Sequence, residues 1–342
     1  MYKTRFLQIC LTSCLFLSSF YVLAEEKLIL AIDLIRHGDR TPTMEIPKAP
    51  YQWQEGLGEL TEQGIAQEVN LGKKLRQIYI NQFHLLPDNY KPGTLYVRTT
   101  NFNRTIASAK AVLLGLYPLS KRGNQTIPID TVLQTKDDLL LARPSKNILF
   151  LAKLFLINQR YWALKTYSIK EKINNWSLET GIKLNNFLAL GRLADNLSIR
   201  QLHHIALPQG LTEEDAKEIT DLATWAMVGY FKLPEVSYPQ GLRFIQEVTN
   251  YFTQASENKS LLRYILYSAH DSTIMSVMTT LGTPLSERPP YASRLNFLFF
   301  NNNNNFYVKI SYNDKPLKLP GCKTIACTLT EFKSLALKQL PF

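Results

Sequence analysis

Cysteine and histidine are both scarce in this sequence, whose 342 residues include four cysteines and five histidines. None of them are spaced like the ligands of a zinc site. The adjacent His203 and His204 would point about 100° apart on a helix, so they could not easily hold one ion together. We therefore expect neither a metal nor a cofactor.

Long apolar runs are missing after residue 24, so the rest of the chain is expected to contain no transmembrane helix. Before that point, Lys3 and Arg5 precede an apolar, uncharged stretch, and small residues stand where a signal peptidase reads. We expect residues 1–24 to be a cleaved signal peptide and the remaining chain to be exported without stable membrane insertion. An uncleaved membrane anchor is the alternative, although polar residues dilute the run.

Cys10 and Cys14 lie within that segment, which leaves Cys322 and Cys327. An even pair in an exported chain, five positions apart after Pro320-Gly321, indicates a local disulfide. Two free thiols are the alternative.

Blocks of Lys and Arg are missing as well. The formal charge is +11, or +9 once Lys3 and Arg5 have left with the signal (11 − 2), and the basic residues are scattered. This balance favours acidic partners such as phosphorylated small molecules, and we expect no nucleic acid partner.

A composition rich in Lys and Asn favours a bacterial host. Periplasmic and extracellular locations both stay open, as does the oligomeric state, a homodimer included.

Apolar runs and periodicity predict an α/β fold. Residues 28–35 and 261–268 are typical of strands buried on both faces of a sheet, and residues 94–99 form a shorter strand. Each is followed by a helical pattern, and two further strands are expected within residues 294–312. We predict a central, mostly parallel sheet flanked by helices, with a C-terminal antiparallel strand pair. The expected helices are 103–116, 272–281 and one beginning at Thr61, with Ile65, Val69, Gly72, Leu75 and Tyr79 on its inner face.

The middle of the chain differs from the two ends. Residues 118–240 hold helical patterns at 150–167, 177–196 and 213–231 and few strand signals. We interpret this segment as a mainly helical cap, inserted into a core made of residues 25–117 and 241–342.

Charged residues stand directly after the predicted strands. Arg36, His37 and Arg40 follow the first strand, His270 and Asp271 follow the second, and Arg98 ends the third. Ligands bind at the carboxyl ends of strands in open α/β sheets. Arginines and histidines converging there would repel one another unless an anion joined them, and guanidinium groups match phosphate oxygens bidentately. The sequence therefore predicts a phosphate site at this edge.

The first cluster reads Arg36-His37-Gly38-Asp39-Arg40-Thr41-Pro42, which resembles the signature of the histidine acid phosphatases. This family is a branch of the histidine phosphatase superfamily that includes phytases, and the chain most resembles its prostatic, lysosomal and bacterial members. Matching blocks run in family order from about residue 28 to 332, with the cap matching weakly. They include Tyr96-Val97-Arg98-Thr99-Thr100, Arg104-Thr105-Ile106-Ala107-Ser108-Ala109, Tyr267-Ser268-Ala269-His270-Asp271-Ser272-Thr273, Pro289-Pro290-Tyr291-Ala292-Ser293 and Leu319-Pro320-Gly321-Cys322.

The resemblance implies an acid phosphatase, a phosphoric monoester hydrolase acting through a phosphohistidine. His37 would be the nucleophile and Asp271 the proton donor. The phosphate would be clamped by Arg36, Arg40, Arg98 and His270. A departure falls after the Tyr-Ala-Ser block, where relatives carry a glutamate and this chain reads Arg294-Leu295-Asn296-Phe297-Leu298.

Several functions compete. A non-specific acid phosphatase acting on small phosphomonoesters is favoured over a phytase or sugar-phosphatase, because the basic residues of the cap, such as Lys165 and Lys172, are spread out. A secreted phosphate-ligand-binding protein without catalysis would show damage at one of the implied positions, and none is damaged. A phosphoglycerate-mutase-like transferase fits poorly with an export signal.

Overall fold

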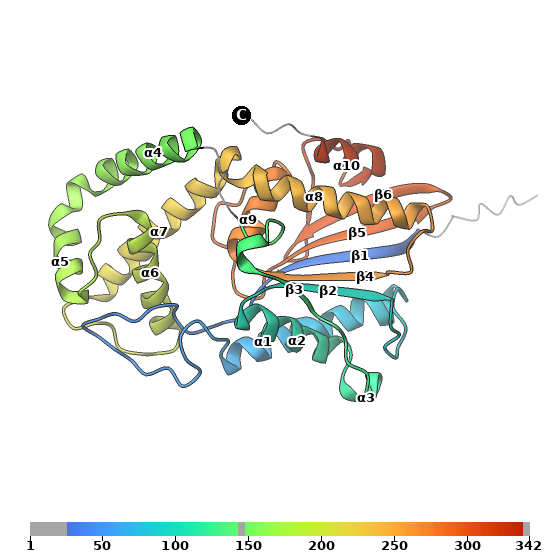
Figure 1. The fold of residues 1–342 in the computed structure, drawn as a ribbon, viewed down its shortest axis with the longest axis horizontal. Coiled ribbons are helices and arrows are strands. Elements are labelled where there is room, and N and C mark those ends of the chain that lie inside the picture. Colours follow the sequence, from blue (N-terminus) through green and yellow to red (C-terminus); the bar gives the residue numbers. More distant parts are fainter. Residues whose placement is uncertain (1–25, 143–147, 338–342) are drawn as a thin grey trace, which may run out of the picture.

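The computed structural model describes residues 26–142 and 148–337. Its centre is one mixed sheet with the strand order β3-β2-β4-β1-β5-β6-β7, and β8 pairs with β6. The four strands from β3 to β1 are parallel, whereas the pairs beyond β1 are antiparallel. The predicted fold class is thus confirmed (Figure 1). The strands are β1 (Lys27–Arg36), β2 (Leu95–Thr100), β3 (Asp130–Val132), β4 (Tyr264–Ala269), β5 (Arg294–Asn302), β6 (Asn305–Tyr312), β7 (Lys315–Leu317) and β8 (Ala326–Thr328).

Helices cover both faces of the sheet, as Figure 1 shows. On one face lie α1 (Glu62–Arg76), which continues as the π-helix η1 (Gln77–Gln82), and α2 (Asn103–Leu116). On the other face lie α8 (Pro234–Ser256), α9 (Asp271–Thr280) and α10 (Leu329–Ala336). The central strands β1 and β4 are therefore buried on both sides, which explains their nearly continuous apolar sequences.

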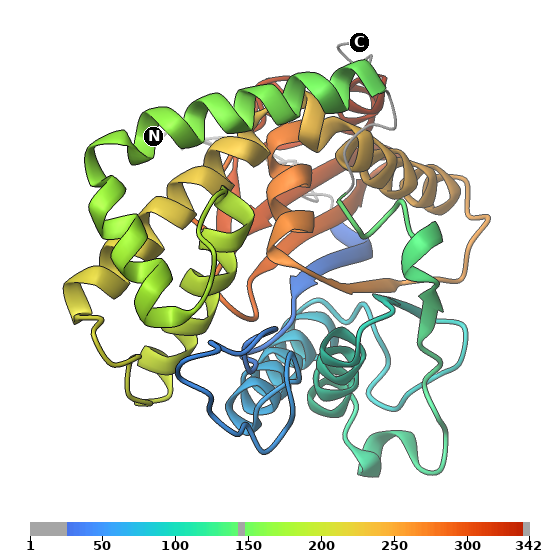
Figure 2. The same ribbon diagram turned by 60° about the vertical axis from the view of Figure 1, so that its left-hand side comes forward.

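A group of helices stands beyond the carboxyl ends of the parallel strands, at the left in Figure 1 and in front in Figure 2. It comprises α4 (Ile148–Thr166), the 3₁₀ turn η3 (Tyr167–Ile169), α5 (Lys170–Thr180), α6 (Phe187–Leu202) and α7 (Glu213–Lys232). These helices have a core of their own around Trp176, Leu190 and Leu197. The single helix expected over 177–196 was wrong. Gly181 adopts left-handed φ 73° and ends α5, and Asn186 then caps α6.

The limits of this cap differ from the expected 118–240. Within that range lie α3 (Leu119–Arg122), η2 (Gln134–Lys136) and the strand β3, which pairs with β2. At the other limit, α8 runs from Pro234 to Ser256 without interruption. We propose that the cap comprises η3 and α4–α7, and that residues 118–142 and α8 belong to the core.

The expected disulfide joins Cys322 and Cys327, with 5.1 Å between their Cα atoms. Both cysteines are buried in the apolar cluster beneath α8, so the bond fixes the short loop before β8. In the described part of the chain, no helix is both long and apolar enough to cross a bilayer.

The predicted inner face of α1 is confirmed at Gly72, Leu75 and Tyr79, which are buried, but it is wrong at the start of the helix. Ile65 is exposed, whereas Glu68 is completely buried between Gly64 and Gly72 on the face that contacts α2. Gly72 and Gly115 allow the two helix backbones to touch, because a Cβ at Gly72 would lie 2.0 Å from the carbonyl oxygen of Val112. Close packing of the backbones therefore decides the orientation of α1, and a carboxyl group is buried as a result.

Glu68 makes stability depend on pH. Burial raises the pKa of Glu68 well above its ordinary value, and the Ser108 hydroxyl offsets only part of this rise. The folded state therefore binds the proton more tightly than the unfolded chain. The contribution of Glu68 to the free energy of unfolding is complete below about pH 4.3, the pKa of glutamate in the unfolded chain. It is lost as the pH rises through the pKa of Glu68 in the folded protein. The loss is about 1.4 kcal/mol for each unit between the two pKa values.

We expect Glu68→Gln to remove this component, so the free energy of unfolding should fall less between pH 5 and pH 7 than in the unchanged protein. Urea unfolding at both pH values measures the difference. Equal pH dependence of the two proteins would show that Glu68 is ionised in the fold.

Candidate active site

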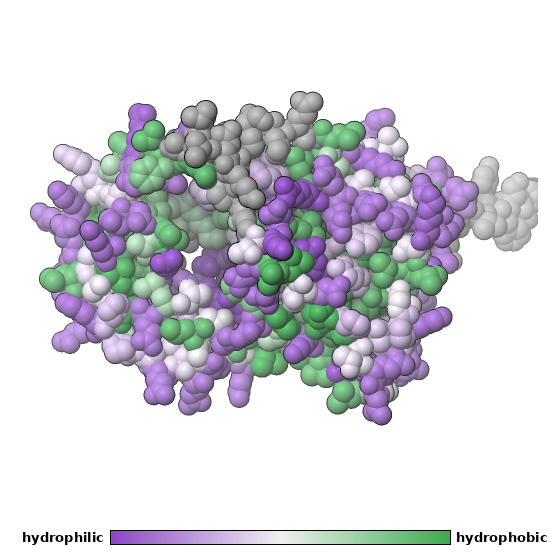
Figure 3. Space-filling model, in the orientation of Figure 1, coloured by the Kyte–Doolittle hydropathy of each residue, from purple (hydrophilic) through white to green (hydrophobic). Residues whose placement is uncertain are grey.

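The register of β1 and β4 brings the two predicted histidines together. Arg36 pairs with Ala269 in the parallel ladder, so His37 and His270 follow at the same edge of the sheet. Their ring centroids are 5.6 Å apart, and both side chains are buried. Residues separated by more than 230 positions in sequence thus form one site beneath the cap. Figure 3 shows the surface hollowed between the cap and the core.

The loop after β1 is held against the start of α1. A Cβ at Gly38 would lie 2.4 Å from the carbonyl oxygen of Gly64, so glycine is required for this close packing. Asp39 accepts hydrogen bonds from the Thr61 hydroxyl at 2.6 Å and pairs with His203 of the cap at 2.7 Å. Asp39 therefore fixes the loop after β1 through these two contacts. It pairs with a histidine and not with a neighbouring arginine.

His37 is a buried imidazole with one nitrogen occupied. Its Nδ1 lies 2.8 Å from the carbonyl oxygen of Gly38, which can only accept, so Nδ1 carries the proton and Nε2 keeps its lone pair. Burial, first of all, and then the charge of Arg36 hold the pKa of His37 well below its ordinary value. Both effects favour the neutral imidazole.

His270 is neutral for similar reasons. Burial, followed by the charge of Arg104, lowers the pKa of His270 to about 3. Its Nε2 lies 3.0 Å from the Thr100 hydroxyl at the end of β2, which fixes the ring. Phe102 packs edge-on against it at 5.2 Å between ring centroids.

Arg36 and Arg40 line the site but are partly engaged. One terminal nitrogen of Arg36 donates to the carbonyl oxygen of Pro289 at 2.5 Å, the other lies 3.3 Å from Asp271, and the guanidinium stacks over Tyr291. Arg40 makes a bidentate pair with Asp195 of α6, both distances being 2.9 Å. Asp195 was not identified from the sequence.

Arg98 and Arg104 differ in position. Arg98 pairs with the buried Asp137 at 2.8 Å and borders a hollow together with Lys136 and Arg243. Arg104, at the start of α2, acts electrostatically on His37, His270 and Arg40. Burial and then the nearby Arg40 lower the pKa of Arg104 to about 10. The structure thus brings together five of the six residues expected at the phosphate, with Arg104 where Arg98 was expected.

Arg104 could have been found from the sequence. It lies four residues beyond the end of β2, at the beginning of a helix, and so at the ligand-binding edge of the sheet. Arg98 belongs to the strand itself, where alternate side chains point to opposite faces and an edge position is not assured.

The arginine side chains of this site have hydrogen-bond donors without acceptors. The buried Nε atoms of Arg36, Arg40 and Arg104 have no hydrogen-bond partner among the described residues. The four guanidinium groups of Arg36, Arg40, Arg104 and Arg288 face the carboxylates of Asp195 and Asp271, which leaves an excess of two positive charges (4 − 2). A phosphomonoester dianion supplies both the missing charge and the missing acceptors.

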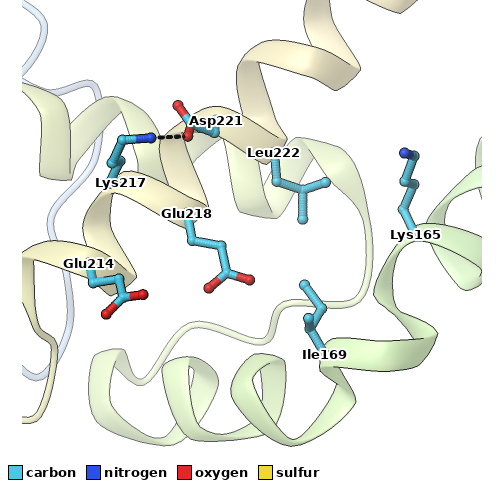
Figure 4. A pocket seen from close by; sticks show the side chains of 7 residues that line it. All are labelled: Lys165, Ile169, Glu214, Lys217, Glu218, Asp221 and Leu222. Carbon is cyan, nitrogen blue, oxygen red and sulfur yellow. Dashed lines mark hydrogen bonds and ion pairs between the residues drawn. The ribbon is translucent and has the colours of Figure 1, made fainter.

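Another surface hollow lies away from these residues. It is bordered by η3 and the end of α4 on one side and by α7 on the other (Figure 4). Its walls mix charges of both signs, including Lys165, Lys217, Glu218 and Asp221, and none of the predicted site residues contributes. In the part of the chain that the structure describes, no group of three or more His, Cys, Asp or Glu side chains could hold a metal ion.

An α/β sheet with a neutral histidine and several arginines at the carboxyl edge defines a class of phosphate-binding enzyme. Comparison with known proteins gives the family. The sequence profile described as histidine phosphatase superfamily (branch 2) matches residues 27–313. Prostatic acid phosphatase of Bos taurus is 31% identical over 326 residues, which cover 88% of this chain and 82% of that protein. Lysosomal acid phosphatase of Bos taurus is 30% identical, with 90% and 77% covered.

The chain therefore belongs to the histidine phosphatase superfamily, branch 2. The resemblance seen in the sequence is confirmed, and so is the prediction that the chain is an acid phosphatase-type enzyme. Among solved structures, a phytase from Klebsiella sp ASR1 superposes with a TM-score of 0.70 over 91% of this chain and 96% of that one. At 17% identity, this likeness concerns the fold alone.

Proposed function

We propose that this enzyme hydrolyses small phosphomonoesters through a phosphohistidine on His37, with Asp271 as the proton donor. The observation that carries the proposal is the state of His37. It is neutral, its Nδ1–H is held by the Gly38 carbonyl, and its Nε2 is free amid unpaired guanidinium nitrogens.

In the first step, Nε2 of His37 attacks the phosphorus in line with the ester oxygen. The P–N bond forms, the P–O ester bond breaks, and Asp271 gives its proton to the departing oxygen. In the second step, water attacks the phosphorus, its proton passes to the Asp271 carboxylate, and the P–N bond breaks to release phosphate. Arg36, Arg40, Arg104 and His270 hold the phosphoryl oxygens, where charge is spread in the transition state.

The substrate range is proposed to be broad. Two of the cap lysines that could bind further phosphates have partners within the cap. Lys172 pairs with Glu218 at 2.6 Å, and Lys165 lies over the ring of Trp225. This favours a non-specific acid phosphatase over an enzyme with a pocket for a polyphosphorylated sugar.

Export is also a proposal. Residues 1–24, the expected signal peptide, lie outside the described residues. The Cys322–Cys327 disulfide supports an oxidising compartment, such as a periplasm or the extracellular space.

Replacing Asp271 by alanine tests the proton-donor role. A leaving alkoxide needs the proton far more than a leaving nitrophenolate does. Departure of the alcohol is reported by kcat/KM, whereas kcat also contains the second step, which is common to both substrates. We therefore expect kcat/KM for glycerol 2-phosphate to fall about 10²- to 10⁴-fold and kcat/KM for p-nitrophenyl phosphate to fall much less. Equal losses on the two substrates would contradict the assignment.

A further inference from the structure

Arg288 stands against Asp271, although nothing in the sequence singled it out. It lies in the loop between α9 and β5, directly before Pro289. Its Nε donates to Oδ2 of Asp271 at 2.6 Å, and a terminal nitrogen lies 3.5 Å from Oδ1 of Asp195. The side chain is 32% exposed, so it forms part of the wall of the site rather than of the core.

Both oxygens of Asp271 are occupied. Oδ1 accepts from the backbone N–H of Ser272 at 2.7 Å, while Oδ2 is shared between Arg288 and Arg36. The Arg288 contact is the shorter of the two guanidinium contacts, at 2.6 Å against 3.3 Å. The charged and titratable groups that surround Asp271 are Arg36 and His37 after β1, Arg104 on α2, its neighbour His270, Arg288 itself and, beyond Arg288, Asp195 on α6.

Arg288 also links Asp271 to the cap. Asp195 holds Arg40 bidentately, so a continuous chain of charges runs from Arg40 through Asp195 and Arg288 to Asp271. Each member has an opposite charge beside it, which keeps the carboxyl group of Asp271 in one orientation.

We expect only one of the two guanidinium contacts to change when substrate binds. Arg36 has an unpaired Nε beside His37, so a phosphate dianion bound there competes with Asp271 for Arg36. Arg288 has Asp195 as its second partner, so we expect it to stay on Asp271.

We propose that Arg288 is a positioning residue for the acid–base chemistry of Asp271, which holds Oδ2 in place and favours the carboxylate over the protonated acid. The proposal rests on the role of Asp271 given above. This has a consequence for specificity. Asp271 acts well as the base when water attacks the phosphohistidine, but it donates a proton to the leaving oxygen readily only at low pH. Esters with good leaving groups, such as aryl phosphates, are then favoured over alkyl phosphates above that pH.

The electrostatics agree with this geometry. Burial alone would raise the pKa of Asp271, but the charges of Arg288 and then Arg36 overcome it and hold the pKa well below its ordinary value. Loss of Arg288 removes the larger of these two charge effects.

The test compares Arg288→Leu and Arg288→Lys with the unchanged full chain. Glu287→Gln serves as the control, because this exposed neighbour has no contact with Asp271. The measurement is kcat against pH for glycerol 2-phosphate and for p-nitrophenyl phosphate, since kcat reports groups in the enzyme–substrate complex. Circular dichroism confirms that each variant is folded.

For glycerol 2-phosphate, we expect Arg288→Leu to move the alkaline limb of kcat upward by about one pH unit. Arg288→Lys should move it less, and Glu287→Gln should not move it. The limb for p-nitrophenyl phosphate should shift less in every variant. An unmoved limb in a folded Arg288→Leu protein, with or without a rise in KM, would overturn the proposal. Failure of the Asp271 role itself would appear instead as equal losses on both substrates in Asp271→Ala.

Discussion

Replacing His37 by alanine is expected to lower kcat on p-nitrophenyl phosphate by at least about 10⁴-fold, because the reaction loses the atom on which its intermediate forms. The fold should persist, since His37 is at the end of β1 and makes its ring hydrogen bond only to the neighbouring Gly38. Steady-state rates at acidic pH measure the effect, and thermal unfolding of the variant checks its stability.

The matched control is His84→Asn. His84 is exposed, its Nδ1 lies 3.0 Å from the carbonyl oxygen of Ile80, and its left-handed backbone is one that asparagine tolerates. We expect its activity to be unchanged. If the His37 variant kept a tenth or more of the normal kcat, another group would have to be the nucleophile.

Replacing Arg104 and replacing Arg98 should have very different effects on catalysis. Arg104→Leu should lower kcat/KM about 10²- to 10³-fold, the loss expected when one preorganised donor to the transferred phosphoryl group is removed. Arg98→Leu should change kcat/KM by less than about threefold, because Arg98 faces Asp137 instead. Its effect should appear as lower stability, since the buried Asp137 would lose its counter-charge.

Kinetics of both variants at a temperature well below their unfolding transitions provide the comparison. If Arg98→Leu lowered kcat/KM more than Arg104→Leu, Arg98 would be the residue that binds the phosphoryl group. Equal and large losses in both would indicate that the two guanidinium groups act together.

The sequence was most informative where a single strand carries a strong local pattern. The nearly continuous apolar residues of β1 and β4 predicted strands buried on both faces, and the rule about strand ends then placed His37 and His270 at one edge. Helix α2 was predicted with its observed limits, Asn103–Leu116. These features depend on local composition and on the general geometry of parallel sheets, and both can be recognised in the sequence.

Features set by contacts between distant segments could not be predicted. The apolar pattern of α1 pointed to Ile65, but close backbone packing at Gly72 and Gly115 turned Glu68 inward. Asp195 and Arg288 belong to a cap helix and a loop without any distinctive pattern, and only the folded chain brings Arg288 to Asp271 and Asp195 to Arg288. The partner of Arg98 was equally hidden, because Asp137 lies in an irregular segment after β3.

The most direct test of the central claim is detection of the phosphorylated enzyme during turnover. The full chain and the Asp271→Ala variant would be mixed with p-nitrophenyl phosphate at acidic pH, quenched in alkali, which preserves phosphohistidine, and mapped by peptide mass spectrometry. We expect one phosphoryl group on the peptide that contains His37, and we expect it to be more abundant in the Asp271→Ala variant, because the second step of that variant lacks the base. Turnover with His37 unmodified, or a phosphoryl group on any other residue, would contradict it.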